Sequence, residues 1–152
     1  MIDVIDLKKT FGDLEVLKGI NVTINKGDIV VVIGPSGSGK STFLRCLNCM
    51  EDPTSGSIIF NGVDIADMRV DINIHRRHMG MVFQHFNLFN NMTVIENIMM
   101  APVYVRCKEL KKAKRKGTLA PDAPKTKAEI KAQARAEALE LLRRIGLEDK
   151  AD

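Results

Sequence analysis

The stretch IVVVIGPSGSGKST, residues 29–42, decides the fold of this chain. Residues 29–33 are continuously apolar and β-branched, which is typical of a strand buried on both faces. The eight residues that follow match the pattern G-x-x-x-x-G-K-[ST] at every position, and a segment with apolar residues at helical spacing comes next. A strand, a glycine-rich turn and a helix in this order predict a phosphate-binding loop. A turn that only joins a strand to a helix is the simpler alternative.

The residue types of the loop explain how it would hold a phosphate. Glycines let the backbone curl so that successive N–H groups point inward, and the N-terminus of the next helix adds partial positive charge. Lys40 is expected to reach the β- and γ-phosphates, the Ser41 hydroxyl to ligate Mg²⁺, and Thr42 to support the α- and β-phosphates. The residues expected to contact the nucleotide are Gly34, Pro35, Ser36, Gly37, Ser38, Gly39, Lys40, Ser41 and Thr42. The sequence therefore predicts binding of a nucleoside triphosphate with Mg²⁺.

Strands surround the loop, and helices follow towards the C-terminus. The other strands are expected at residues 2–11, 16–24, 57–65 (a hairpin) and 78–84. One helix is expected at residues 40–50, and two more begin at capping-box patterns, Thr93 with Glu96 and Thr126 with Glu129. Residues 106–125 hold two prolines and a run of lysines, and are interpreted as a solvated, mobile linker.

Composition limits the class of protein. The 152 residues are 45% hydrophobic and 28% charged, which is typical of a globular domain. The longest aliphatic run is far short of the roughly 20 residues that span a bilayer, and the N-terminal residues MIDVIDLKKTF lack the apolar core of a signal peptide. The net charge of +4 belongs to one segment, because residues 106–131 hold ten basic and three acidic residues. Three cysteines leave an odd count, which favours a reducing, cytosolic compartment over a disulfide framework.

No acidic residue in the sequence completes the expected metal site. A phosphate-loop NTPase usually has a second apolar strand that ends in an aspartate, which holds the Mg²⁺ shell. The apolar runs downstream of the loop end at Asn61 and Gln84. Asp64, Asp67 and Asp71 lie in a polar stretch with no buried run before them, which favours surface or turn positions. The sequence thus predicts a phosphate cradle with no visible general base or metal-holding aspartate.

The order of these motifs resembles one known family. The phosphate loop, then TSGSIIFNGVDI and MGMVFQHFNLFNNMTVIENIMMAP, is similar to the ATP-binding subunit of ABC transporters, and most similar to the ATPases of bacterial polar amino-acid importers. The resemblance implies an α/β fold of the P-loop NTPase (ABC ATPase) type with an antiparallel β subdomain, and ATP with Mg²⁺ as ligands. It also implies that Phe11 stacks on the adenine and that Val16 packs beside it. Lys40 and Gln84 are then the candidate catalytic residues, and Ser41 and Gln84 the candidate metal ligands.

The resemblance further implies partners and a place in the cell. Such subunits couple ATP binding and hydrolysis to import of a polar amino acid, work as homodimers, and associate peripherally with the cytoplasmic face of the inner membrane through transmembrane permease subunits. Residues 85–91 would face the permease, and Asn90 and Asn91 stand where the family commonly has proline and histidine. The last residues resemble the helix before the family's LSGGQ signature, which implies a truncated chain whose fold is incomplete at the C-terminus. The expected organisation is a nucleotide-binding core at residues 1–105, a basic linker or insertion at 106–125 and the start of a helical subdomain at 126–152.

Other interpretations stay open at this point. A stand-alone small-molecule kinase would carry the same loop with an arginine cluster, for which Arg76 and Arg77 are thin candidates, and a non-catalytic ATP sensor would be a deliberately short chain. Cys46 and Cys49 form a C-x-x-C, but both lie near the apolar face of a helix, which favours packing over zinc binding. The basic segment lacks aromatic residues for base stacking, so nucleic acid is not an expected partner, and a solvated segment is favoured over lipid contact.

Overall fold

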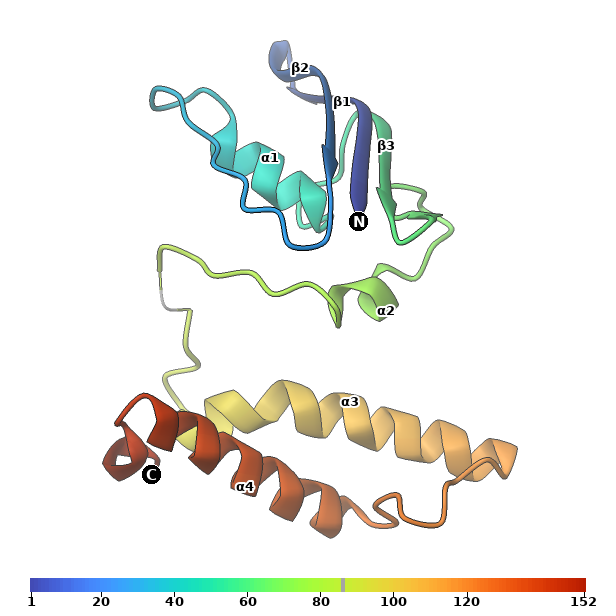
Figure 1. Ribbon diagram of the computed structural model, residues 1–152, viewed down its shortest axis with the longest axis vertical. Coiled ribbons are helices and arrows are strands. Elements are labelled where there is room, and N and C mark those ends of the chain that lie inside the picture. The colour runs from blue at the N-terminus through green and yellow to red at the C-terminus, as the bar shows by residue number, and fades with distance from the viewer. Residues whose placement is uncertain (86) are drawn as a thin grey trace. The chain divides into compact units, whose positions relative to one another are not determined.

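The structure of the chain, a computed structural model, describes residues 1–85 and 87–152. These residues form two compact units, Met1–Val82 and Phe83–Asp152 (Figure 1). Each unit has its own hydrophobic core. The first unit holds the sheet and the phosphate loop, and the second unit is mainly helical. No helix in the described part of the chain has both the length and the hydropathy that crossing a membrane requires.

The first unit is built on a four-stranded antiparallel sheet with the order β2-β1-β3-β4. Its strands are β1 (Ile2–Phe11), β2 (Leu14–Ile24), β3 (Ser55–Phe60) and β4 (Val63–Asp64). The predicted hairpin at residues 57–65 is confirmed as β3 and β4. Asn61 and Gly62 form its turn, and both have the positive φ that a tight hairpin turn needs, 48° and 83°.

The helix α1 (Lys40–Leu47) follows the phosphate loop and contributes Phe43 and Cys46 to the core of the first unit. The strands supply the other side of this core, chiefly Val4, Leu7, Leu17, Ile58 and Phe60. The helix is shorter than the predicted 40–50. Cys46 lies on its buried side and Cys49 is buried just past its end, whereas Leu44 and Met50 are half exposed. A short helix, α2 (Ile72–Arg76), is tied to the end of α1 because the Arg76 guanidinium donates to the carbonyl oxygens of Asn48 and Cys49 at 3.0 and 2.6 Å.

Two predicted strands are not formed. Residues 29–33 and 78–84 have no regular structure, and the exposed fractions of Ile29 and Val82 are 94% and 99%. A continuously apolar strand is typical of a sheet whose two faces are both covered, and it needs a neighbouring strand to pair with. Among the described residues, no strand pairs with residues 29–33. Residues 30–33 instead line an open apolar cavity of about 560 Å³ beside β2. The prediction of strands at these two runs was therefore wrong.

The second unit is a helical hairpin. α3 (Val94–Lys116) begins at a complete capping box between Thr93 and Glu96, as predicted, and ends at Gly117. α4 (Lys127–Arg144) returns alongside α3 and is followed by a short 3₁₀ helix, η1 (Glu148–Lys150) (Figure 1). The core of the hairpin contains Ile95, Ala138, Leu142 and Ala151. The Ile95 N–H donates to the Ala151 carbonyl at 2.9 Å, which fixes the C-terminal residues to the start of α3.

The basic segment differs from the predicted mobile linker in its first half. Residues 106–116 continue α3, because leucine, alanine, lysine and arginine are strong helix formers. Thr126 is the N-cap of α4, as its pattern predicts. Its hydroxyl oxygen accepts from the Glu129 N–H at 3.1 Å, and the Glu129 carboxylate accepts from the Lys125 N–H at 2.8 Å. The domain limits at residues 105 and 125 remain a prediction.

Candidate nucleotide-binding site

The phosphate loop lies directly against the sheet at Gly39. This glycine is the N-cap of α1 and has a φ of 87°. A Cβ at this position would lie 2.9 Å from Val16 Cγ1 and 3.2 Å from Leu17 Cδ2 of β2. Both distances are shorter than an ordinary van der Waals contact, so only glycine lets the loop approach β2 this closely. The close approach places the first turn of α1 at the edge of the sheet.

The loop curls back on itself between Gly34 and Ser38. The Ser38 N–H donates to the Pro35 carbonyl at 3.3 Å, and a Cβ on Gly34 would lie 2.7 Å from Ser38 Oγ. Gly34 therefore leaves room for the Ser38 side chain inside the curl. Gly37, with a φ of 80°, makes the turn at the tip and has no atom within 4 Å of a Cβ. Gly34 and Gly39 thus stand where a side chain would meet neighbouring atoms, and Gly37 stands at an open turn.

Lys40 occupies the inside of this curl. Its Nζ donates to the carbonyl oxygens of Gly34 and Pro35 at 2.8 and 2.7 Å. Ser41 and Thr42 follow in the first turn of α1. This turn contains no acidic residue, so the partial positive charge at the helix N-terminus is not neutralised by a carboxylate of the turn. A cation, a helix N-terminus and a glycine-rich backbone at one place are the groups that bind a polyphosphate. The loop and the first turn of α1 therefore fit a polyphosphate, with the Ser41 hydroxyl as the group of this turn that would ligate Mg²⁺.

Phe11 ends β1 and exposes its ring to solvent, with 45% of the residue accessible. The Lys9 Nζ lies over one face of this ring, 4.7 Å from its centroid, and is itself held by Glu51 Oε1 at 2.6 Å and the Asp52 carbonyl at 2.7 Å. Lys9 was not among the predicted site residues. The available signal was its spacing of two residues from Phe11 on a strand, which puts both side chains on the same face. Val16 lies close to Gly39, and its expected packing beside the adenine remains a prediction.

Gln84 belongs to the second unit and is exposed, whereas the phosphate loop belongs to the first. Its expected contacts with Mg²⁺ and water remain a prediction. The same holds for the expected permease-facing residues 85–91, of which Phe86 lies outside the described residues.

The C-x-x-C pair is part of the core, as predicted. Cys46 and Cys49 are buried, and burial raises the pKa of the Cys46 thiol to about 11 and also raises the pKa of Cys49. The Cys49 thiol donates to the Ile65 carbonyl at 3.2 Å. Over the residues that the structure describes, no group of histidine, cysteine, aspartate or glutamate side chains is arranged to hold a metal ion.

Comparison with known proteins identifies relatives along the whole chain. The sequence profile of the ABC transporter family matches residues 17–152. The chain is 54% identical over 99 residues to the glutamine transport ATP-binding protein GlnQ of Geobacillus stearothermophilus, covering 65% of this chain and 41% of that protein. It is 48% identical over 150 residues to the arginine transport ATP-binding protein ArtM of Bacillus subtilis (strain 168), covering 99% of this chain and 54% of that protein. The chain thus spans about half the length of the relatives it matches.

Among solved structures, the chain is similar to the dimeric bacterial ABC transporter cassette MJ0796. The TM-score is 0.61 with 25% sequence identity, covering 99% of this chain and 85% of that one. The likeness confirms the predicted α/β fold of the ABC ATPase type with an antiparallel β subdomain. Both relatives are named as transport ATP-binding proteins. Sequence profile, relatives and fold together show that this chain belongs to the ABC transporter family.

Proposed function

We infer that this chain supplies the ATP-binding part of an ABC importer, and that the whole protein couples ATP binding and hydrolysis to the import of a polar amino acid. The observation that carries this proposal is the phosphate loop, with Gly39 packed on β2 and the Lys40 ammonium held inside the curl. GlnQ and ArtM are transport ATP-binding proteins for glutamine and arginine, and their names support an amino acid as the transported substrate.

Lys40 is the residue that recognises the charge of the triphosphate. On binding, its ammonium exchanges the neutral carbonyl oxygens of Gly34 and Pro35 for β- and γ-phosphate oxygens, which accept stronger hydrogen bonds because they are charged. Ser41 supplies a hydroxyl for Mg²⁺ and Thr42 supports the α/β side, both from the first turn of α1. Mg²⁺, when bound, neutralises charge on the β- and γ-phosphate oxygens. Gln84 is proposed to add an amide oxygen to the metal and its water.

Phe11 is the proposed platform for the adenine. Its ring is half exposed, and the Lys9 ammonium covers one face, which leaves the ring fixed in position by a cation–π contact. Base stacking on an aromatic ring is sequence-tolerant and contributes about 1–3 kcal/mol. Phe11 would therefore strengthen binding of ATP without contributing to recognition of the phosphates.

The proposed partners are transmembrane permease subunits and a second ATP-binding subunit. The solved structure that this chain resembles is a dimer, which supports pairing of two ATP-binding subunits in the whole protein. The proposed location is peripheral, at the cytoplasmic face of the inner membrane, with residues 85–91 turned to the permease.

The experiment that tests the proposal is an equilibrium titration of the chain with Mg²⁺–ATP. Lys40→Ala removes hydrogen bonds to charged groups that contribute about 1.5–3 kcal/mol, so the affinity should fall by about 10- to 150-fold. Lys26→Ala, which removes an exposed lysine from the turn before residue 29, should leave the affinity unchanged. Equal affinities for all three proteins would contradict the assignment of the loop.

A second arm of the same titration separates the adenine platform from the phosphate cradle. Phe11→Ala should weaken binding of ATP and leave binding of inorganic triphosphate unchanged. Lys40→Ala should weaken both ligands. Loss of triphosphate binding in the Phe11 variant would show that Phe11 supports the fold of the loop rather than the base.

A further inference from the structure

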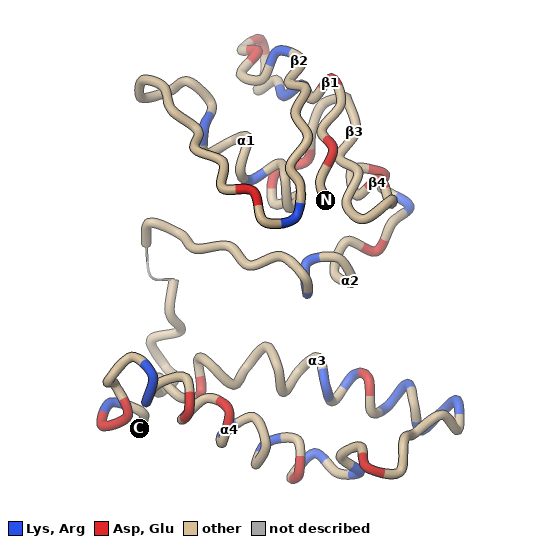
Figure 2. The backbone as a smooth tube through the Cα atoms, viewed as in Figure 1, with Lys and Arg blue, Asp and Glu red and all other residues tan. Residues whose placement is uncertain are grey.

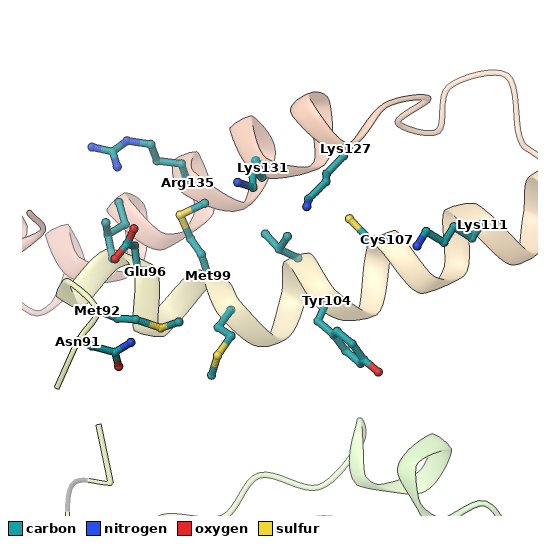
Figure 3. Close-up of a pocket in the computed structure, with 13 residues that line it drawn as sticks. Asn91, Met92, Glu96, Met99, Tyr104, Cys107, Lys111, Lys127, Lys131 and Arg135 are labelled. Atoms are coloured by element: carbon teal, nitrogen blue, oxygen red, sulfur yellow. The ribbon is translucent and has the colours of Figure 1, made fainter. Parts of the chain in front are cut away.

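The hairpin of the second unit contains a groove of about 710 Å³ between α3 and α4 (Figure 3). One side of the groove is a stripe along α3 made by every fourth residue. Residues at this spacing lie on one face of a helix. The stripe consists of Ile95, Met99, Val103 and Cys107, and Lys111 continues it for one more turn. Ile95 is buried, and the next three are half-buried, so the groove has an apolar floor with a thiol at its far end.

The other side of the groove is a basic stripe on α4. It consists of Lys127, Lys131 and Arg135, again four residues apart. Arg135 is engaged by the Asp152 carboxylate at 3.1 Å. The ammonium groups of Lys111, Lys127 and Lys131 form no ion pair with a carboxylate of residues 1–85 or 87–152.

The basic rim and the apolar floor meet at one end of the groove. Figure 3 shows Lys127 reaching from α4 towards α3, on the side where the Cys107 sulfur points towards α4. Figure 2 shows how basic residues gather along the later part of α3 and the start of α4. Glu96 is the one acid that lines the groove among the described residues, and its carboxylate is held by the Thr93 N–H at 3.1 Å. The groove thus combines an apolar floor with a positive rim, in which Lys111, Lys127 and Lys131 have no carboxylate partner among the described residues.

We propose that this groove binds a small amphiphilic anion, with its alkyl chain on the α3 stripe and its carboxylate among Lys111, Lys127 and Lys131. The volume lies within the range of about 300–1,000 Å³ that is typical of small-ligand pockets. A docked helix about 10 Å across needs about 420 Å³ per turn, so the groove holds fewer than two turns of one. Size therefore favours a small molecule, and charge complementarity favours an anion.

The chain carries two probes for this groove. Its single tyrosine, Tyr104, is among the residues that line the groove, and the chain has no tryptophan. Tyrosine fluorescence therefore reports on the groove alone. Cys107 also lines the groove and is half exposed, whereas Cys46 and Cys49 are buried. A thiol reagent therefore labels Cys107 selectively in the folded chain, and a bound ligand should slow that labelling.

The experiment titrates the full chain with decanoate below its micelle concentration, and with decanol and decyltrimethylammonium as the neutral and cationic counterparts. Decanoate should change the Tyr104 fluorescence and slow Cys107 labelling with one saturable midpoint. The double variant Lys127→Gln/Lys131→Gln should weaken decanoate binding by about 2- to 30-fold, the range for losing two exposed charge pairs. The control Lys112→Gln/Lys114→Gln changes the net charge equally outside the groove and should leave the midpoint unchanged.

Three outcomes would overturn the proposal. Decanol binding as tightly as decanoate would show that the positive rim plays no part. An equal loss in both double variants, with unchanged circular dichroism, would assign the effect to overall charge. Failure of decanoate to protect Cys107, while an acidic amphipathic peptide does protect it, would assign the groove to a partner helix.

Discussion

Replacing Gly39 by alanine should destabilise the first unit more than the same replacement at Gly37. Both glycines lie in the phosphate loop with similar positive φ values of 87° and 80°, so a side chain has a similar backbone cost of about 1–2 kcal/mol at either place. Only at Gly39 would the new Cβ meet neighbours, Val16 Cγ1 at 2.9 Å and Leu17 Cδ2 at 3.2 Å. Overpacking of this kind costs about 1–3 kcal/mol. We therefore expect a total loss of about 2–5 kcal/mol for Gly39→Ala.

The assay must follow the first unit by itself, since two compact units need not unfold together. Cys46 is fully buried in the core of the first unit, so its labelling by a thiol reagent, followed by peptide mass spectrometry, reports the unfolding of that unit. With a urea slope of about 2 kcal/mol/M, the extra 1–3 kcal/mol for Gly39→Ala should place its midpoint about 0.5–1.5 M below that of Gly37→Ala.

The contact argument can be refuted in two ways. Equal urea midpoints for Gly37→Ala and Gly39→Ala would show that the backbone conformation alone sets the cost. A double-mutant cycle gives the second test: Val16→Ala removes the atom that lies 2.9 Å from the new Cβ, so it should restore part of the stability lost in Gly39→Ala. No coupling between the two substitutions would mean that the loop moves away from β2 instead of pressing on it.

Three other predictions concern the rest of the molecule. Thr93→Ala removes the capping box of α3 and should lower the free energy of unfolding of the second unit by about 1 kcal/mol, measured by urea unfolding followed at Tyr104; an unchanged midpoint would contradict the cap. The hydrogen bonds from the Arg69 side chain and backbone lower the pKa of Asp67 from 3.8 to about 2. The ionised Asp67 therefore stabilises the folded state above pH 3.8, and this stabilisation is lost as the pH falls towards 2. Carboxyl NMR should show Asp67 titrating near 2, and Arg69→Gln should raise that pKa towards 3.8. Cys46, with its pKa raised to about 11, should stay unlabelled at pH 8 in the folded chain while Cys107 reacts, and similar rates for both would contradict the burial of Cys46.

Features that depend on a few neighbouring residues were predictable from the sequence. The hairpin at Asn61 and Gly62 and the capping box at Thr93 need only local backbone geometry and a side chain within three or four residues, and the phosphate loop is recognised from eight consecutive residues, 34–41. The buried position of Cys46 also followed from helical spacing. In these cases the residue type and its spacing specify one local arrangement.

Features that depend on distant neighbours were not predictable in the same way. Residues 29–33 have the composition of a buried strand, but a strand also needs partners, and none of the described strands pairs with them. The lysine run at residues 106–116 has a composition that suits both a linker and a helix. It is helical in the structure because it continues α3, which begins at Val94. The contact of Lys9 with Phe11 depends on Glu51 and Asp52, about 40 residues away in the sequence, which hold the ammonium in place.

The hydrogen bonds that Lys40 makes to Gly34 and Pro35 have a consequence for the entropy of binding. A lysine side chain has about 2 kcal/mol of rotamer entropy, which is lost when its ammonium is fixed. Because the loop already holds the ammonium, most of that freedom is lost when the chain folds and little remains to be lost when a ligand arrives. The affinity for a phosphate then depends mainly on the difference between two sets of acceptors, two carbonyl oxygens before binding and the oxygens of an anion afterwards. A ligand that places a weak hydrogen-bond acceptor at this position should therefore gain almost no affinity from Lys40, even when it lies at the same distance from the ammonium.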